Sequence, residues 1–259
     1  MEIHVLVKQT YDPNTLEPNP KTLEPIYERA QTKLSDFDLN ALEEGIRMKE
    51  NFKGRVVVIS AGPDVKPLLI REALAMGADE AYVVSDKRLE HADGWVYANV
   101  LASLSRTVGN ADLILCGECS VDEGGYQVGP RVAEKLGLPS VTHVIRIHAE
   151  QEGLRVERDL EEGREVLDVK LPIVLTVGLE INTPRLPSLL MIRAASKKPI
   201  NSVPLESLGL DENELRPRVV CASVRALKVE RKRVVISGSL DEAAEKLLSE
   251  LVREGLVRI

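Results

Sequence analysis

The sequence predicts an α/β fold with a doubly wound, mostly parallel sheet, a small β hairpin or meander, and an extended C-terminal arm that ends in a helix. Over residues 1–147, five strand patterns alternate with four helical patterns, as in doubly wound sheets. The run from Val56 to Ile59 is apolar throughout, which is typical of a central strand buried on both faces. Beyond residue 147, turn signals and prolines replace this alternation.

The five strands are expected at residues 3–7, 55–60, 81–84, 113–116 and 141–147. A loop rich in proline and asparagine, residues 12–25, follows the first strand. The helices are recognised by their apolar periodicity and by their ends. The markers are Leu39, Leu42 and Ile46 after Ser35 and Asp36, then Leu69, Ala73 and Met76 before Gly77, then a helix capped by Asp93 that reaches about Arg106, and finally residues 127–136 before Gly137.

The second part of the chain has a different residue pattern. Turn signals at Glu152-Gly153 and Glu162-Gly163 predict a hairpin or meander at about residues 145–170. Residues 171–177 form a further buried strand with Pro172 near its start. Five prolines between residues 184 and 217 predict an extended segment. Ser239 and Glu242 form a capping box before an apolar stripe made by Ala244, Leu247, Leu248 and Leu251. We therefore expect a domain at 1–183 and an arm at 184–259.

Composition excludes several classes of protein. The 259 residues carry a net charge of −7 and give a pI of about 5.3, which argues against a nucleic-acid surface. No apolar run approaches the roughly 20 residues of a membrane helix, and the start has no signal segment, so a cytoplasmic location is expected. Three cysteines exclude a disulfide scaffold. Aromatic residues make up only 3% of the chain, too few for an aromatic cage.

The segment 117–130, GECSVDEGGYQVGP, carries the most information about function. It begins at the end of a predicted parallel strand and runs into a helix, the place where open α/β sheets bind ligands. Glycines let backbone N–H groups approach a phosphate, and the helix N-terminus favours an anion. The alternative is an ordinary loop, since the segment is neither a Walker A loop nor a GxGxxG fingerprint. Residues 6–8 and 60–63 end two other strands at the same rim, where the alternative is a plain turn.

Two further motifs have competing interpretations. Cys116 and Cys119 have a C-x-x-C spacing, but there is no second cysteine pair and the four histidines are scattered, so neither a redox pair nor a metal site is expected. Leu189, Leu190, Met191 and Ile192 are consecutive apolar residues. They form either one turn of a core helix or an exposed apolar knob for a partner.

Eight segments in order carry a family pattern. They are HVLVK at 4–8, FDLNALEEGIRMKE at 37–50, SAGP at 60–63, REALAMGADEA at 71–81, DLILCGECSVDEGGYQVGP at 112–130, GLPSVTHV at 137–144, VERDLEEGREVLDVKLPIVLTV at 156–177 and INTPRLPSLLMIRAASKKPI at 181–200. In this combination, nearly the whole chain resembles the β subunit of electron transfer flavoproteins. The resemblance implies a Rossmann-like, adenine-nucleotide-binding fold and an arm that wraps onto an α subunit.

The resemblance also implies site residues. Nucleotide contacts are expected at Leu6, Ser35, Phe37, Asp38, Ala61, Gly117, Glu118, Cys119, Ser120, Val121, Asp122, Gly124, Gly125, Tyr126, Gln127 and Val128. The family's recognition leucine, which inserts into partner dehydrogenases, falls on Leu189. Neither catalytic residues nor metal ligands are implied.

The nucleotide itself remains open between FAD and AMP. The family's usual NPF reads Ser35-Asp36-Phe37 here, and the common D-G-D-T before Q-V-G-P is replaced by a stretch that ends in the bulkier Tyr126. Residues 127–130 look more like the electron-bifurcating branch, in which NADH donates to a second flavin, and Gly124-Gly125 lets the chain pass close to a pyrophosphate. The bulk of Tyr126 and the scarcity of aromatic residues argue the other way. FAD is favoured, with AMP as the alternative.

The expected function is therefore that of an electron carrier subunit without catalytic residues of its own. It would form a heterodimer with an α subunit and relay electrons between dehydrogenases and an acceptor such as a quinone oxidoreductase. Two other classes stay open at this point. One is a stand-alone adenine-nucleotide-binding or sensing module, and the other is a thiol oxidoreductase that uses Cys116 and Cys119.

Overall fold

The computed structural model describes residues 1–150, 153–227 and 231–258 and divides the chain into two compact units. The first unit comprises Met1–Val224 and the second Arg225–Ile259. The sequence predicts a nucleotide-binding domain at 1–183, and this functional division stays a prediction.

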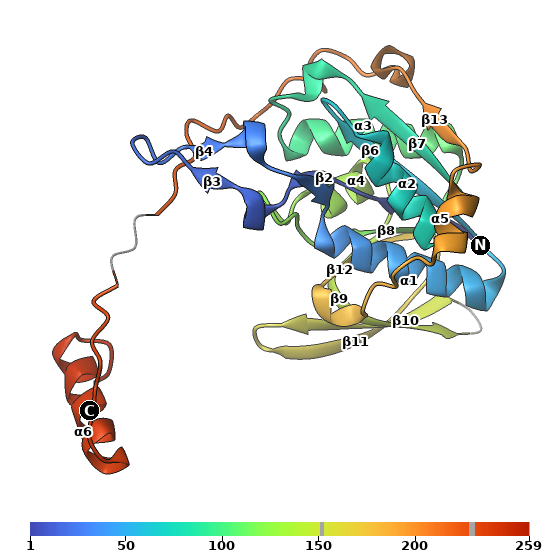
Figure 1. The fold of residues 1–259 in the computed structure, drawn as a ribbon. Coiled ribbons are helices and arrows are strands. Elements are labelled where there is room, and N and C mark those ends of the chain that lie inside the picture. Colours follow the sequence, from blue (N-terminus) through green and yellow to red (C-terminus); the bar gives the residue numbers. More distant parts are fainter. Residues whose placement is uncertain (151–152, 228–230, 259) are drawn as a thin grey trace. The chain divides into compact units, whose positions relative to one another are not determined.

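A nine-stranded sheet forms the centre of the first unit (Figure 1). Its order is β11-β10-β9-β12-β8-β1-β6-β7-β13. The bounds are β1 (Glu2–Leu6), β6 (Arg55–Gly62), β7 (Glu80–Ser85), β8 (Leu113–Gly117), β9 (Ser140–Glu150), β10 (Gly153–Leu160), β11 (Gly163–Val169), β12 (Ile173–Val177) and β13 (Ile200–Ser202). Within this sheet, neighbouring strands from β9 to β13 in the order given pair in parallel, whereas β9-β10 and β10-β11 pair antiparallel. The mostly parallel sheet and the meander at its edge are both confirmed.

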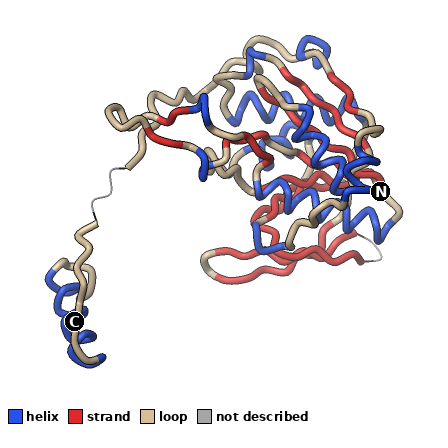
Figure 2. The backbone as a smooth tube through the Cα atoms, in the orientation of Figure 1, coloured by secondary structure: helices blue, strands red, loops and turns tan. Residues whose placement is uncertain are grey.

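Helices cover both faces of this sheet, and the strands lie between them (Figure 2). Helices α1 (Asp36–Phe52) and α2 (Pro67–Met76) contribute to one core, and α3 (Gly94–Val108) and α4 (Val128–Leu136) to the other. Strand β6 feeds both, because Val56 and Val58 enter the first core while Val57 and Ile59 enter the second. The continuous apolar run of β6 therefore belongs to a central strand that is buried on both faces, as predicted.

Short elements fill the predicted loop between β1 and α1. They are two strand pairs, β2 (Gln9–Tyr11) with β5 (Thr32–Leu34) and β3 (Glu17–Pro18) with β4 (Pro25–Ile26), and the 3-10 turns η1 (Pro13–Thr15) and η2 (Tyr27–Arg29). The later 3-10 turns are η3 (Lys87–Leu89), η4 (Leu179–Ile181) and η5 (Leu205–Leu208). Strands of two or three residues are too short to produce a periodic pattern, which is why the sequence reads as loop there.

The turn signals of the meander are partly described. Gly163 opens β11 with a φ of +142°, and Gly153 opens β10 with a φ of +114°. Glu152, the other half of the first signal, lies outside the described residues. Pro172 directly precedes β12, and the Leu171–Pro172 peptide is cis.

The proline-rich segment is less extended than its composition predicts. It contains α5 (Leu189–Ala195) and β13, which pairs with β7 at the edge of the sheet, and Leu205 is buried in the core beside α3. The prediction of a wholly extended segment therefore needs this correction. Prolines at the edge of a sheet lose no ladder bonds, so proline content alone does not exclude packing.

The second unit contains α6 (Leu240–Arg253). The predicted capping box is present, because the Ser239 hydroxyl accepts from the Glu242 N–H at 3.4 Å and the Ser239 N–H donates to Glu242 Oε2 at 2.9 Å. Ala244, Leu247 and Leu248 of its apolar stripe are exposed. Among the described residues, no helix combines the length and the apolar composition needed to cross a membrane.

Candidate nucleotide-binding site

The candidate site lies at the carboxyl ends of β1 and β8. The chain builds β6 and β7 on one side of β1 and then returns to place β8 on the other side. This reversal is the point at which open α/β sheets bind ligands. Leu6 ends β1, Gly117 ends β8, and Ala61 lies one residue before the end of β6. The structure therefore brings these three predicted residues to one edge, although Leu6 and Ala61 point their side chains into the core beside α3.

Asp38 joins the two strands at this edge. Its Oδ2 accepts from the Lys8 N–H at 2.8 Å and its Oδ1 accepts from the Gly117 N–H at 2.9 Å. Burial raises the pKa of Asp38 to about 7, while the two N–H donors act in the opposite direction. Because both carboxylate oxygens already have backbone partners, Asp38 acts as a brace. A direct contact between Asp38 and the nucleotide stays a prediction.

The N-terminus of α1 abuts the end of β8. A β-carbon on Gly117 would lie 2.5 Å from the Phe37 Cβ and 2.7 Å from Asp38 Oδ1, so only glycine fits there. Ser35 precedes α1 and is buried, and its N–H donates to the Lys8 carbonyl at 3.0 Å. Its Oγ has no hydrogen-bond partner among the described residues. A buried hydroxyl of this kind fits a site that is completed by a ligand oxygen.

The loop from Gly117 to Gln127 is open in its middle. A β-carbon on Gly124 or Gly125 would meet no atom within 4 Å, and Gly124 has a φ of +57°. The loop leads into α4, whose N-terminal N–H groups carry a partial positive charge. Open backbone beside a helix N-terminus fits the phosphate of a nucleotide. Val121 is half-buried, the Gln127 side chain lies beside the start of α3, and Val128 packs on the α3 core.

Charged residues surround this loop. The Lys8 Nζ lies 2.9 Å from Asp122 Oδ1, 3.2 Å from Glu123 Oε1 and 3.3 Å from the Ser120 hydroxyl. On the other side, Glu118 Oε2 lies 2.8 Å from His143 Nδ1, and the His143 ring stacks on Tyr126 with centroids 5.8 Å apart. The sequence placed Lys8 at the rim without assigning it a contact, and it did not indicate His143 at all. Lys8 had a signal, its position just beyond a strand of the rim.

Tyr126 and His143 share an unusual backbone. Both have a positive φ, +53° and +58° respectively, which side chains with a β-carbon adopt rarely. His143 lies where the pairing of β9 with β12 shifts register. This bulge turns the His143 ring toward the loop, and nothing in the sequence pattern marks it. Tyr126 is 51% exposed.

The cysteine pair has the properties of packing residues. Cys116 is buried in the α3 core, and burial raises the pKa of its thiol far above the ordinary range. Burial also raises the pKa of Cys119, so neither thiol has the lowered pKa of a redox cysteine. All three cysteines are free. Among the residues that the structure describes, no group of three or more His, Cys, Asp or Glu side chains could hold a metal ion.

Leu189 lies away from this site, at the start of α5. It is 84% exposed, and Leu190 and Ile192 are exposed as well. The alternative in which this run forms a turn of a core helix is therefore wrong. Ala195 is the buried residue of α5. The role of Leu189 in recognising a partner stays a prediction.

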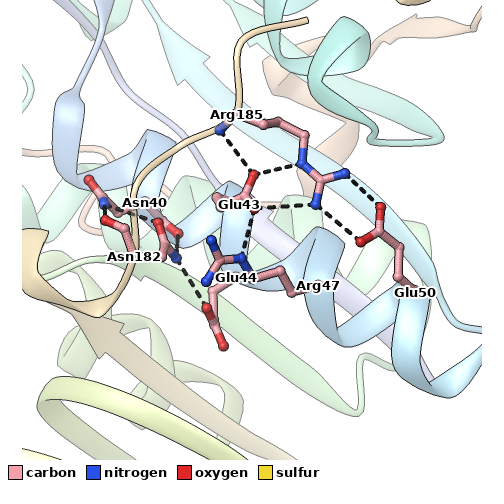
Figure 3. Close-up of polar contacts among 7 residues, drawn as sticks. All are labelled: Asn40, Glu43, Glu44, Arg47, Glu50, Asn182 and Arg185. Carbon is pink, nitrogen blue, oxygen red and sulfur yellow. Dashed lines mark hydrogen bonds and ion pairs between the residues drawn. The ribbon is translucent and has the colours of Figure 1, made fainter.

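The chain just before α5 is fastened to α1 by charged and amide side chains (Figure 3). Arg185 donates to Glu43 Oε2 at 2.8 Å and to Glu50 Oε1 at 2.6 Å, and Asn182 exchanges hydrogen bonds with Asn40. Burial would raise the pKa of Glu43, but hydrogen bonds from Arg185 and Arg47 leave it below its ordinary value. These contacts fix the start of the exposed apolar run.

Comparison with known proteins identifies relatives along nearly the whole chain. Residues 26–208 match the family model of the electron transfer flavoprotein domain. The chain is 39% identical to an electron transfer flavoprotein subunit beta of Thermoanaerobacterium thermosaccharolyticum, over 97% of this chain and 98% of that one. It is 34% identical to the caffeyl-CoA reductase-Etf complex subunit CarD of Acetobacterium woodii, over 99% of this chain and 100% of that one.

A third relative extends the same pattern at lower identity. The electron transfer flavoprotein subunit beta of Bacillus subtilis is 31% identical, over 99% of this chain and 100% of that one. The matched region contains α1, the loop before α4 and the exposed run of α5. On these findings, the chain belongs to the electron transfer flavoprotein family, among its β subunits.

Proposed function

We propose that this β subunit binds an adenine nucleotide at the carboxyl ends of β1 and β8, as part of a heterodimer that relays electrons between dehydrogenases and an acceptor such as a quinone oxidoreductase. The observation that carries the proposal is the loop before α4, in which the backbone at Gly124 and Gly125 is open. The buried Ser35 hydroxyl without a partner supports a ligand at the same edge.

FAD is favoured over AMP as the nucleotide. FAD contains AMP as one of its two halves, and the glycine loop and the N-terminus of α4 would hold this part of either ligand. A bound flavin would supply the redox chemistry, and this chain would contribute its position and electrostatic surroundings. The Tyr126 ring is exposed and stacks on His143 beside the loop, so it is not packed into the space that a ligand at the loop would use. This supports a ligand larger than AMP, such as FAD. A second flavin in this subunit would in turn support electron bifurcation, with NADH as its electron donor.

The partners are an α subunit and the dehydrogenases that deliver electrons. The exposed apolar faces of α5 and α6, each described within its own unit, support two separate contacts. Leu189 would insert into a dehydrogenase, and α6 would dock on the α subunit. The relative named for a caffeyl-CoA reductase-Etf complex is a precedent for such assembly. A cytoplasmic location remains part of this proposal.

The test is the nucleotide content of the gently purified heterodimer. Absorbance spectroscopy would count flavin, and mass spectrometry of the heat-released nucleotides would identify them. Two FAD and no AMP per heterodimer support a second flavin in this subunit. One FAD with one AMP would leave a simple carrier, in which the nucleotide of the β subunit is structural. A heterodimer without any adenine nucleotide in this subunit would contradict the proposal.

A further inference from the structure

The loop that is proposed to hold a phosphate is itself acidic. It contains Glu118, Asp122 and Glu123 and no lysine or arginine between Gly117 and Val128. Glu118 is already paired with His143. Asp122 and Glu123 are instead paired with Lys8, a residue of a different segment. An incoming phosphate would be repelled by two carboxylates unless a cation changed its partner.

Lys8 has a fixed backbone and a partly exposed side chain. Its N–H donates to Asp38 and its carbonyl accepts from the Ser35 N–H, so its backbone is held two residues beyond the end of β1. Its side chain is 27% exposed, and the Nζ reaches the loop at Asp122, Glu123 and Ser120. Glu123 directly precedes Gly124, so the ammonium lies beside the part of the loop where the backbone is open.

We propose that Lys8 is the residue by which this site recognises phosphate charge, its ammonium exchanging Asp122 and Glu123 for the phosphate of a bound adenine nucleotide. The proposal rests on the proposed function and adds the residue that sets its specificity. Partly exposed ion pairs contribute little stability, so the existing pairs are cheap to break. The bond to a phosphate would be charge-assisted, like the carboxylate pairs that it replaces. A phosphate monoester carries about −1.5 to −2 charges and three acceptor oxygens on one group, so a single phosphate can take the place of both carboxylates.

This arrangement makes two opposite predictions for the same site. Removing the ammonium should weaken the binding of compounds in proportion to their phosphate charge and leave a nucleoside unaffected. Removing the charges of Asp122 and Glu123 frees Lys8 and ends the repulsion, so it should strengthen binding of the same phosphate compounds. A residue that merely holds the loop in shape would change nucleoside and nucleotide binding alike.

The experiment measures the dissociation constants of adenosine and AMP by equilibrium dialysis. It uses the heterodimer with the full-length chain after its exchangeable nucleotide has been removed. AMP is the half common to both candidate ligands, so the result is independent of the choice between FAD and AMP. In the wild type, AMP should bind more tightly than adenosine. In Lys8→Gln this preference should fall about tenfold, the worth of one hydrogen bond to a charged group. In the double variant Asp122→Asn/Glu123→Gln the preference should rise.

Two further variants serve as controls. Lys135 lies on α4, has a similar exposure and pairs with Glu214 at 2.9 Å. The variant Lys135→Gln should leave the preference for AMP over adenosine unchanged. Lys8→Arg keeps the charge and should retain most of the preference. An equal loss of adenosine and AMP binding in Lys8→Gln, or an unchanged ratio, would overturn the role of Lys8 while leaving the nucleotide site intact. A wild type that binds neither compound would overturn the proposed function itself.

Discussion

Two glycines at the ends of the loop between β8 and α4, one closing β8 and one in the first turn of α4, differ from the two glycines in its middle. At the ends, Gly117 and Gly129 lie so close to other atoms that a β-carbon would overlap Phe37 in one case and Thr176 in the other. In the middle, Gly124 and Gly125 have no atom within 4 Å of such a carbon. Glycines at the ends serve the packing of the fold, and glycines in the middle leave backbone accessible. Glycine content alone would not have separated the two roles.

The largest expected effect comes from filling the packed end. Gly129 lies in the first turn of α4, where the helix presses on β8 and β12. A β-carbon there would overlap Thr176 Cγ2 and lie 2.8 Å from the Cys116 Sγ. We expect Gly129→Val to lower the free energy of unfolding by about 4 kcal/mol, at the upper end of overpacking effects. Thermal unfolding followed by Trp95 fluorescence would check this, and a variant as stable as the wild type would show that α4 can move away.

The second largest expected effect concerns His4, a buried histidine in β1, the strand that ends at the site. His4 of β1 is fully buried, its Nδ1 lies 2.7 Å from the Ser105 hydroxyl, and burial together with the positive charge of Arg55 lowers its pKa to about 4. Between pH 6.5 and 4 the unfolded chain therefore binds a proton that the folded chain excludes, so the free energy of unfolding falls as the pH is lowered. At 1.36 kcal/mol per pKa unit, the loss reaches about 3 kcal/mol.

The check is the difference between the wild type and His4→Gln, measured by urea unfolding from pH 7 to pH 4. The pKa of Asp38 is raised, and its contribution runs in the opposite direction, because its stabilisation is present at acid pH and is lost as the pH rises toward 7. Asp38 is present in both proteins and cancels in the difference. A difference that does not change with pH would mean that His4 takes up a proton as readily in the folded sheet as in the unfolded chain.

Asp38, which joins Lys8 and Gly117 at the packed end of the loop, gives the next largest expected effect on stability. In Asp38→Asn, the amide can accept one of the two backbone N–H groups but turns an N–H toward the other, leaving a buried donor without a partner. We expect a loss of about 2 kcal/mol near pH 4. The loss should shrink toward pH 7, because the stabilisation by Asp38 itself declines over that range. The measurement is urea unfolding at both pH values, and a loss that grows with pH would contradict the raised pKa.

The same contrast explains what the sequence could and could not predict. Apolar runs such as Val56 to Ile59 carry their burial in their composition, so the central strands and their covering helices were predictable. The brace by Asp38 was not, because it joins Lys8 and Gly117 across the sheet, and no local pattern encodes a contact between distant segments. The three-residue strand β13 was missed for a related reason, since its partner β7 lies far away in the chain.

The site shows the same limit at the level of single residues. Reasoning from the ends of the predicted strands placed the loop at the carboxyl end of β8, where the structure has it. It could not tell that Leu6 and Ala61 turn their side chains into the core, or that His143 reaches the loop through a bulge with a positive φ. Such features depend on how strands are aligned, and that alignment is set by packing rather than by local residue preference.

The smallest expected effect on stability belongs to the open middle of the loop. Gly125 has no neighbouring atom within 4 Å of a β-carbon and no positive φ, so Gly125→Arg should change the free energy of unfolding by less than about 0.5 kcal/mol. The long side chain would nevertheless occupy the space in which the backbone approaches a phosphate, so the heterodimer should lose its adenine nucleotide. Chromatography of heat-released nucleotide checks the second part and thermal unfolding the first, with Gly125→Ala as the variant that should keep both. Full nucleotide occupancy in Gly125→Arg would mean that the open glycines do not face the ligand, and the contrast between the ends and the middle of the loop would then reflect packing alone.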